Sequence, residues 1–250
     1  MTNPISIMRA ELLLKDPRAV MQRDPLRKVP AGGHEGCLVP ITLESKKVKL
    51  EVLPETLRSE ILMMKVFRDY MKETGKMLDG ERLSPEDFTV RVCERLRSAG
   101  VPVVDLIYAK DGVLFMDDFR IGADRCIDGA NFDFSFQPKE LQPPANAYFA
   151  KHSLEIFEAL GKIHGSGFVV SNWHTLLSVF FIVIIGNESK LLVCDYSNLD
   201  QRQDPAEFNS KCQGAFTILL TCACSQWDHT REEFVSAYEK GKNSIQTPAR

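Results

Sequence analysis

The stretch SLEIFEALGKIHGSGFVVSNWHTLLSVFFIVIIGNESKLLVCDYSNLD, residues 153–200, decides the fold of this chain. Its first part places Leu, Phe, Leu and Ile at helical spacing, which predicts a helix over Ser153–His164. Gly165 and Gly167 supply the residue type that commonly ends a helix. A loop is then expected over Phe168–Thr175.

The second part of the stretch predicts a β-hairpin. The run Val179–Ile185 is β-branched and aromatic, a polar turn follows at Gly186–Ser189, and Leu191–Cys194 is apolar again. The next residue is Asp195. In such a hairpin, the carboxylate of Asp195 would lie at the open end, next to the last residue of the second strand.

This order resembles the central segment of the protein-kinase-like superfamily, where a helix leads to the catalytic loop and a short hairpin leads to the metal-binding Asp of the Asp-Phe-Gly motif. Ile163–Phe168 is similar to the helix end LHxxGxxH of small atypical kinases, and Asp195-Tyr196-Ser197 stands where Asp-Phe-Gly would. The KEOPS-complex kinase and the aminoglycoside phosphotransferases are the nearest groups. The resemblance implies an α+β, bilobal fold with a small antiparallel-sheet N-lobe and a reduced helical C-lobe.

The catalytic loop departs from the family pattern His-x-Asp-x-x-x-x-Asn. Asn172 stands in place of the catalytic Asp, and Leu177, five positions later, in place of the metal-binding Asn. An amide is no base at neutral pH, although it can hydrogen-bond an acceptor hydroxyl. His174 is the alternative base, unless it is only polar surface. Of the metal ligands only Asp195 remains, so the resemblance implies ATP and Mg²⁺ binding with phosphotransferase activity impaired or lost.

The start of the chain offers candidates for holding phosphate. Residues 1–30 form an N-terminal arm, and a Gly-rich turn between strands follows, in which Gly33 and Gly36 would let backbone N–H groups approach phosphate oxygens. Lys47 and Lys49 share one face of the next predicted strand, and Lys49 is preferred as the lysine on the phosphates. The alternatives are a plain turn and solvated edge-strand lysines.

Two helices are expected to follow in the N-lobe. Glu55–Glu73 carries an apolar stripe, and Ser84–Gly100 begins with an N-cap Ser and a Pro at the first helical position. By resemblance, Glu86 would pair with the strand lysine, with Glu60 as its rival. The alternative is that Glu86 only stabilises the helix dipole.

The Asp-Gly pair at 111–112 predicts a hairpin over Tyr108–Phe119. Met116 and Asp117 then fall where kinases bind adenine through backbone groups of the hinge. The predicted N-lobe is 31–119 and the C-lobe 120–250. The C-lobe would begin with an irregular crossover over residues 121–147. Beyond Asp200 we expect a polar loop over 201–211 and two helices, over 214–224 and 229–240.

Composition fits a soluble globular protein of 250 residues, 44% apolar and 26% charged. A net charge of −3 makes nucleic acid an unlikely partner, and the longest apolar run, Leu176–Ile185, is too short to span a membrane. Seven cysteines without metal-site spacing, and no signal-like N-terminus, indicate a reducing compartment, the cytosol or nucleus.

Three functional hypotheses remain open. The chain is a degraded kinase-like phosphotransferase, a pseudokinase scaffold that keeps nucleotide and takes a protein partner, or an interaction domain without nucleotide. The abrupt loss of the motif after Val170 also fits a misassigned exon over residues 170–185, which sequencing the transcript would test. The acceptor of the phosphoryl group is not specified by any motif.

Overall fold

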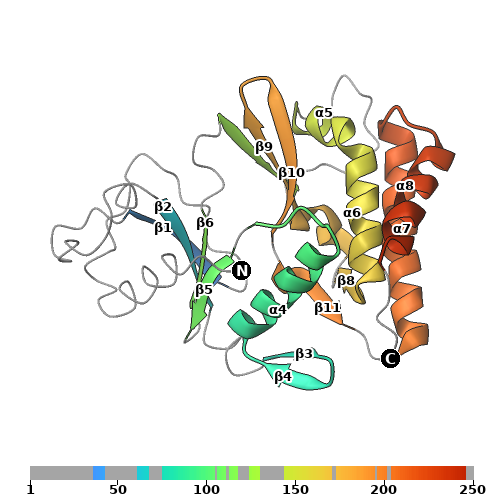
Figure 1. Ribbon diagram of the computed structural model, residues 1–250. Helices are drawn as coiled ribbons and strands as arrows, with labels where there is room; N and C mark the ends of the chain where they lie inside the picture. The colour runs from blue at the N-terminus through green and yellow to red at the C-terminus, as the bar shows by residue number, and fades with distance from the viewer. Residues whose placement is uncertain are drawn as a thin grey trace. The chain divides into compact units, whose positions relative to one another are not determined.

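The computed structural model describes residues 36–42, 61–67, 75–104, 106–110, 113–117, 124–129, 144–170, 173–194, 196–201 and 204–245. These residues contain helices and small antiparallel sheets, so the predicted α+β class is confirmed (Figure 1). The chain divides into two compact units. The first comprises residues 1–76, 82–90 and 104–121, and the second comprises residues 77–81, 91–103 and 122–250.

The first unit contains a four-stranded antiparallel sheet in the order β1-β2-β6-β5. Its strands are β1 (Gly36–Thr42), β2 (Ile61–Phe67), β5 (Leu106–Lys110) and β6 (Val113–Asp117). The last two are neighbours in the sheet and in the sequence, as the Asp-Gly turn predicted. β2 and β6 are central, with a partner strand on each side.

The expected helix over Glu55–Glu73 is wrong where the structure describes it, because Ile61–Phe67 is the strand β2. The sequence there is ILMMKVF, an apolar run broken only by Lys65. A short apolar run fits a buried strand as well as a helix, and periodicity alone does not separate them. Pairing with β1 on one side and β6 on the other satisfies the backbone of β2 and favours the strand.

A hairpin and a helix lie between the strands of this sheet in the sequence. The hairpin consists of β3 (Lys76–Leu78) and β4 (Glu81–Leu83). Its turn holds Asp79 at φ 51° and Gly80 at φ 82°, residue types that adopt this left-handed region most readily. Helix α4 (Pro85–Ser98) follows.

The predicted limits of α4 are confirmed. Ser84 Oγ accepts from the Asp87 N–H at 3.2 Å, as an N-cap does, and Gly100 just past the helix has φ +71°. Phe88, Val92 and Leu96 recur at helical spacing and are at most 1% exposed.

In the second unit, β7 (Arg125–Asp128), β9 (Phe180–Ile185) and β10 (Glu188–Val193) form a three-stranded antiparallel sheet in the order β10-β9-β7. The predicted hairpin is therefore present. However, β7 lies in residues 121–147, where only irregular chain was expected. Its pairing with β9 joins segments far apart in the sequence, which local signals do not show.

The loop expected over Phe168–Thr175 is also partly wrong. β8 (Phe168–Val170) pairs with β11 (Leu199–Gln201), and the 3₁₀-helix η5 spans Trp173–Val179. All three residues of β8 are buried, so this short segment is a core strand.

Four α-helices complete the described part of the second unit. They are α5 (Pro144–Lys151), α6 (Ser153–Gly165), α7 (Pro205–Gln226) and α8 (Arg231–Asn243). The expected polar loop over 201–211 is wrong from Pro205 on, because Asp204 caps α7 and Pro205 is its first residue. Phe157 of α6 stacks on Phe234 of α8 at 4.6 Å between ring centroids, which places the aromatic core between these helices.

Within the described residues, no helix combines the length and the apolar character needed to cross a membrane.

Candidate functional site

The segments that flank Asn172 and Asp195 converge in the second unit. Val170, the last residue of β8, is the ladder partner of Leu199, the first residue of β11. The 3₁₀-helix η6 (Tyr196–Asn198) leads into β11, and Asn198 Nδ2 donates to Ser178 Oγ of η5 at 3.2 Å. The segments on either side of Asn172 and the segment after Asp195 are therefore held together.

Hydrogen bonds also hold the end of β10, which leads to Asp195. The Cys194 N–H donates to the Val179 carbonyl at 3.0 Å, and the Val193 N–H donates to the Pro102 carbonyl at 2.7 Å. Tyr196 is buried, and its hydroxyl donates to the Val193 carbonyl at 2.9 Å. Both neighbours of Asp195 thus have fixed positions.

Leu177 lies in the core of this unit. Its side chain is 1% exposed, and the flanking Leu176 and Val179 are fully buried. Gly129 packs against the same turn so closely that a Cβ on it would lie 1.8 Å from the Leu177 carbonyl oxygen. The position that holds a metal-binding Asn in the family pattern is here a packing position.

These residues do not fit the two-ligand Mg²⁺ site of the family pattern. A buried leucine offers no oxygen to a cation that prefers oxygen ligands. Across the part of the chain that the structure describes, no three His, Cys, Asp or Glu side chains gather as metal ligands either. Asp195, the remaining candidate, lies outside the described residues.

The structure does not test the roles of four other predicted site residues. Asn172, Gly33 and Lys49 lie outside the described residues. His174 belongs to η5, but its side chain is not described. Their roles stay predictions.

The remaining predicted residues belong to the first unit. Gly36 is the first residue of β1, and Asp117 is the last residue of β6. Met116 is 7% exposed and lies in the sheet between Met63 of β2 and Leu106 of β5. Glu86 lies in the first turn of α4 and is 8% exposed, so it is more buried than an acid that serves only the helix dipole needs to be.

Sequence reasoning missed Lys65 because its segment was expected to be helical. Lys65 lies in β2, between Leu38 of β1 and Leu114 of β6 in the sheet register. In the kinase resemblance, the phosphate-binding lysine lies on the strand before the helix that carries its Glu partner. β2 comes before α4 in the sequence, although the β3–β4 hairpin lies between them, and the apolar run around Lys65 was the available signal.

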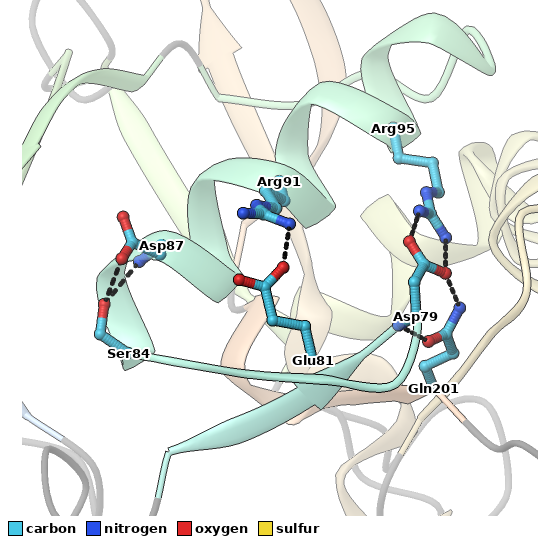
Figure 2. A network of polar contacts seen from close by, with 7 residues as sticks. All are labelled: Asp79, Glu81, Ser84, Asp87, Arg91, Arg95 and Gln201. Carbon is cyan, nitrogen blue, oxygen red and sulfur yellow. Dashed lines mark hydrogen bonds and ion pairs between the residues drawn. The ribbon is translucent and has the colours of Figure 1, made fainter.

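A polar network in the second unit was also missed. Arg95 of α4 binds both carboxylate oxygens of Asp79, and Gln201 Nε2 donates to Asp79 Oδ1 at 2.8 Å (Figure 2). The Asp79 N–H donates back to Gln201 Oε1. The bonds from Arg95 first, and then from Gln201, hold the pKa of Asp79 below its ordinary value.

This network fixes β11, the strand that follows the Asp195 segment. Gln201 ends β11, and the Arg95 guanidinium also lies over the ring of Phe168 in β8, 5.4 Å from the centroid. A second ion pair, Arg91 to Glu81 at 2.8 Å, holds the β3–β4 hairpin on α4 beside it (Figure 2). Only the Asp79-Gly80 turn could have been found from the sequence, since Asp79 and Gln201 are 122 positions apart.

No family model matches the chain, and no curated protein sequence matches it. Several solved structures are similar. The Rio2 kinase–ADP/Mg²⁺–phosphoaspartate complex from Chaetomium thermophilum has 10% identity and a TM-score of 0.48, over 94% of this chain and 65% of that one. This chain thus spans just under two thirds of the length of that Rio2 chain.

Two further structures are similar over most of both chains. WaaP in complex with acyl carrier protein has 13% identity and a TM-score of 0.43, over 88% of this chain and 89% of that one. The Helicobacter pylori proinflammatory kinase CtkA has 9% identity and a TM-score of 0.36, over 88% and 94%. Kinases are thus among the similar structures. At these identities and TM-scores, no activity, ligand or partner carries over to this chain.

Proposed function

We propose that this chain is a kinase-like protein that binds ATP and whose phosphotransferase activity is impaired or lost. The observation that supports impaired or lost phosphotransferase activity is the burial of Leu177, whose side chain is 1% exposed. Phosphoryl transfer depends on cations that neutralise the phosphates and on groups that position the acceptor. With a core leucine at the second ligand position and an amide at the base position, two of these parts are missing.

ATP binding is supported by the groups that remain. The first unit offers a lysine on a central strand, Lys65, and a buried acid, Glu86, on the helix that follows. By resemblance these are the lysine that contacts the phosphates and its glutamate partner. Lys49 is the rival lysine. Asp195 would hold the one metal ion that this ligand set can bind.

A nucleotide titration tests the proposal. ATP should raise the melting temperature of the wild-type chain, since a ligand at about 100 times its Kd stabilises by about 2.7 kcal/mol. Adding Mg²⁺ or Mn²⁺ should increase the shift in wild type but not in Asp195→Ala. Transfer of phosphate from ATP to the chain itself or to a generic protein acceptor should be slow or absent.

The other outcomes discriminate between the functional classes. Binding without any transfer makes the protein a pseudokinase that works as a scaffold or allosteric partner. No nucleotide shift in a folded sample rejects the proposal and leaves a protein-interaction domain. Transfer at an ordinary kinase rate would contradict the impairment, and His174→Ala would then show whether that histidine acts as the base.

We also propose that the protein works in the cytosol or nucleus. The sequence has seven cysteines, an odd number, and several lie inside apolar runs where Cys acts as a small hydrophobe, which supports a reducing compartment.

A further inference from the structure

His152 occupies the N-cap position of α6 but does not cap the helix. Its side chain makes no capping hydrogen bond, although N-caps are normally residues whose side chains satisfy the first N–H groups. The imidazole is 4% exposed and instead lies between two other side chains. Nδ1 is 3.1 Å from Glu155 Oε2, and Nε2 is 2.8 Å from Ser189 Oγ. Helix initiation therefore does not account for this histidine.

The partners of His152 decide where its proton lies. A carboxylate can only accept, so the Glu155 contact requires the hydrogen on Nδ1. In the neutral ring Nε2 then has a free lone pair, and the Ser189 hydroxyl must donate to it. The carboxylate thus fixes the tautomer in which the imidazole can take a proton from serine.

A cation completes the group. Lys151 Nζ donates to Ser189 Oγ at 3.0 Å, so an ammonium group lies beside this oxygen as its proton moves to the imidazole. Ser189 lies on β10 and is half-buried, while Lys151 and His152 lie at the junction of α5 and α6, beside the β9–β10 hairpin (Figure 1). The serine is 37 positions from the histidine in the sequence, so the fold brings them together.

We propose that Ser189 is a nucleophilic serine that accepts an acyl group from an activated ester, with His152 as general base and Glu155 as the residue that positions His152. This activity is separate from the proposed nucleotide binding. The order hydroxyl, imidazole, carboxylate is the arrangement by which an unactivated serine becomes a nucleophile.

In the reaction, Ser189 Oγ forms a bond to the carbonyl carbon while its proton moves to His152 Nε2. The tetrahedral intermediate carries one negative charge, and it collapses with loss of the alkoxide or phenolate, which takes the proton back from the imidazolium when it is basic enough. The products are acyl-Ser189 and an alcohol, or, when the leaving phenolate is too weakly basic to take the proton, acyl-Ser189, the phenolate and a proton that the imidazolium gives to water. A phosphoryl donor brings several negative charges, and a single lysine neutralises them less well.

The first experiment uses p-nitrophenyl acetate and the full chain. Wild type should release p-nitrophenolate and carry one acetyl group on Ser189, located by peptide mass spectrometry. Ser189→Ala should lose both the release and the adduct. Ser225→Ala is the matched control, because Ser225 is an exposed serine whose hydroxyl donates to the Cys222 carbonyl, and it should react as wild type does.

The second experiment separates a catalytic from a structural role. The Glu155 side chain is 63% exposed, so Glu155→Gln should fold normally, but it should slow acetylation of Ser189 at least about ten-fold, and Glu155→Asp should recover part of the rate. An unmodified Ser189 in folded wild type would overturn the proposal. So would acetylation of the Glu155→Gln variant at the wild-type rate, even if His152 variants fail to fold.

Discussion

At the scale of single residues, Leu177 links packing to the loss of a metal ligand. Replacing it with Asn would restore the family pattern at this position, but the amide would enter a site that is 1% exposed. A lost leucine side chain and a poorly bonded buried amide together cost about 2–5 kcal/mol. We expect Leu177→Asn to lower the free energy of unfolding by this amount, measured in urea, without restoring phosphate transfer.

Leu177→Met is the control for this substitution, because a swap of similar volume between apolar residues costs less than about 1.5 kcal/mol. If Leu177→Asn were as stable as Leu177→Met, Leu177 would not be a core residue, and the argument for impaired metal binding would fail.

His164 is the residue that should make stability depend on pH. It is 1% exposed, its Nδ1 lies 2.8 Å from the Tyr238 hydroxyl oxygen, and burial lowers its pKa to about 3, with the charge of Lys242 as a smaller cause. The unfolded chain has a histidine pKa near 6.5, so between these values the unfolded state binds more protons. The stability contributed by neutral His164 is therefore fully present above about pH 6.5, and it is lost as the pH falls towards 3.

We expect this loss to reach at most about 1.4 kcal/mol per pH unit, measured by urea unfolding at pH 7.5, 6 and 5. His164→Asn should flatten the dependence in this window. An equal slope in wild type and in His164→Asn would contradict the assignment.

At the scale of elements, α6 and α8 pack at backbone contact through glycines. A Cβ on Gly161 of α6 would lie 2.1 Å from the Tyr238 carbonyl oxygen, and one on Gly241 of α8 would lie 2.1 Å from that of Glu158. Backbone atoms cannot move aside as a flexible side chain does. We expect Gly161→Ala to destabilise the protein by about 1–3 kcal/mol, as overpacking does, measured by thermal and urea unfolding.

Gly214 in α7 offers the matched control, because a Cβ there would meet no heavy atom within 4 Å in the described part of the chain. Gly214→Ala should raise stability by about 0.5–1 kcal/mol through helix propensity. A gain in both variants would show that the two helices can separate without cost.

The elements also show what the sequence could reveal. Helices α4 and α6 and the β9–β10 hairpin were predicted because their signals are local: a cap, a periodic apolar stripe, a turn. β2 was taken for a helix because a short continuous apolar run suits both structures. The pairing of β8 with β11 and of β7 with β9 depends on partners distant in the sequence, for which no local pattern exists.

The same distinction holds for the candidate site. Leu177 and Asn172 could be identified by resemblance to the family's catalytic-loop motif, because that motif is local in the sequence. The bonds from Arg95 and Gln201 to Asp79, and the contact of His152 with Ser189, join residues that only the fold brings together. Lys65 was missed for a third reason, because the wrong element was predicted around it.

At the scale of the whole molecule, the choice of lysine decides whether the kinase resemblance extends to function. Lys65 is on a central strand that comes before α4 in the sequence, with the β3–β4 hairpin between them, and we propose it as the phosphate-binding lysine, whereas Lys49 was chosen from spacing. We expect Lys65→Ala to abolish the rise in melting temperature with ATP and Lys49→Ala to retain it. Lys211→Ala, which removes an exposed lysine of α7, controls for the loss of one positive charge. The opposite result, with only Lys49→Ala losing the shift, would move the phosphate contact out of β2. It would also show that the position of a lysine in the sheet of the first unit does not identify the residue that contacts the nucleotide phosphates.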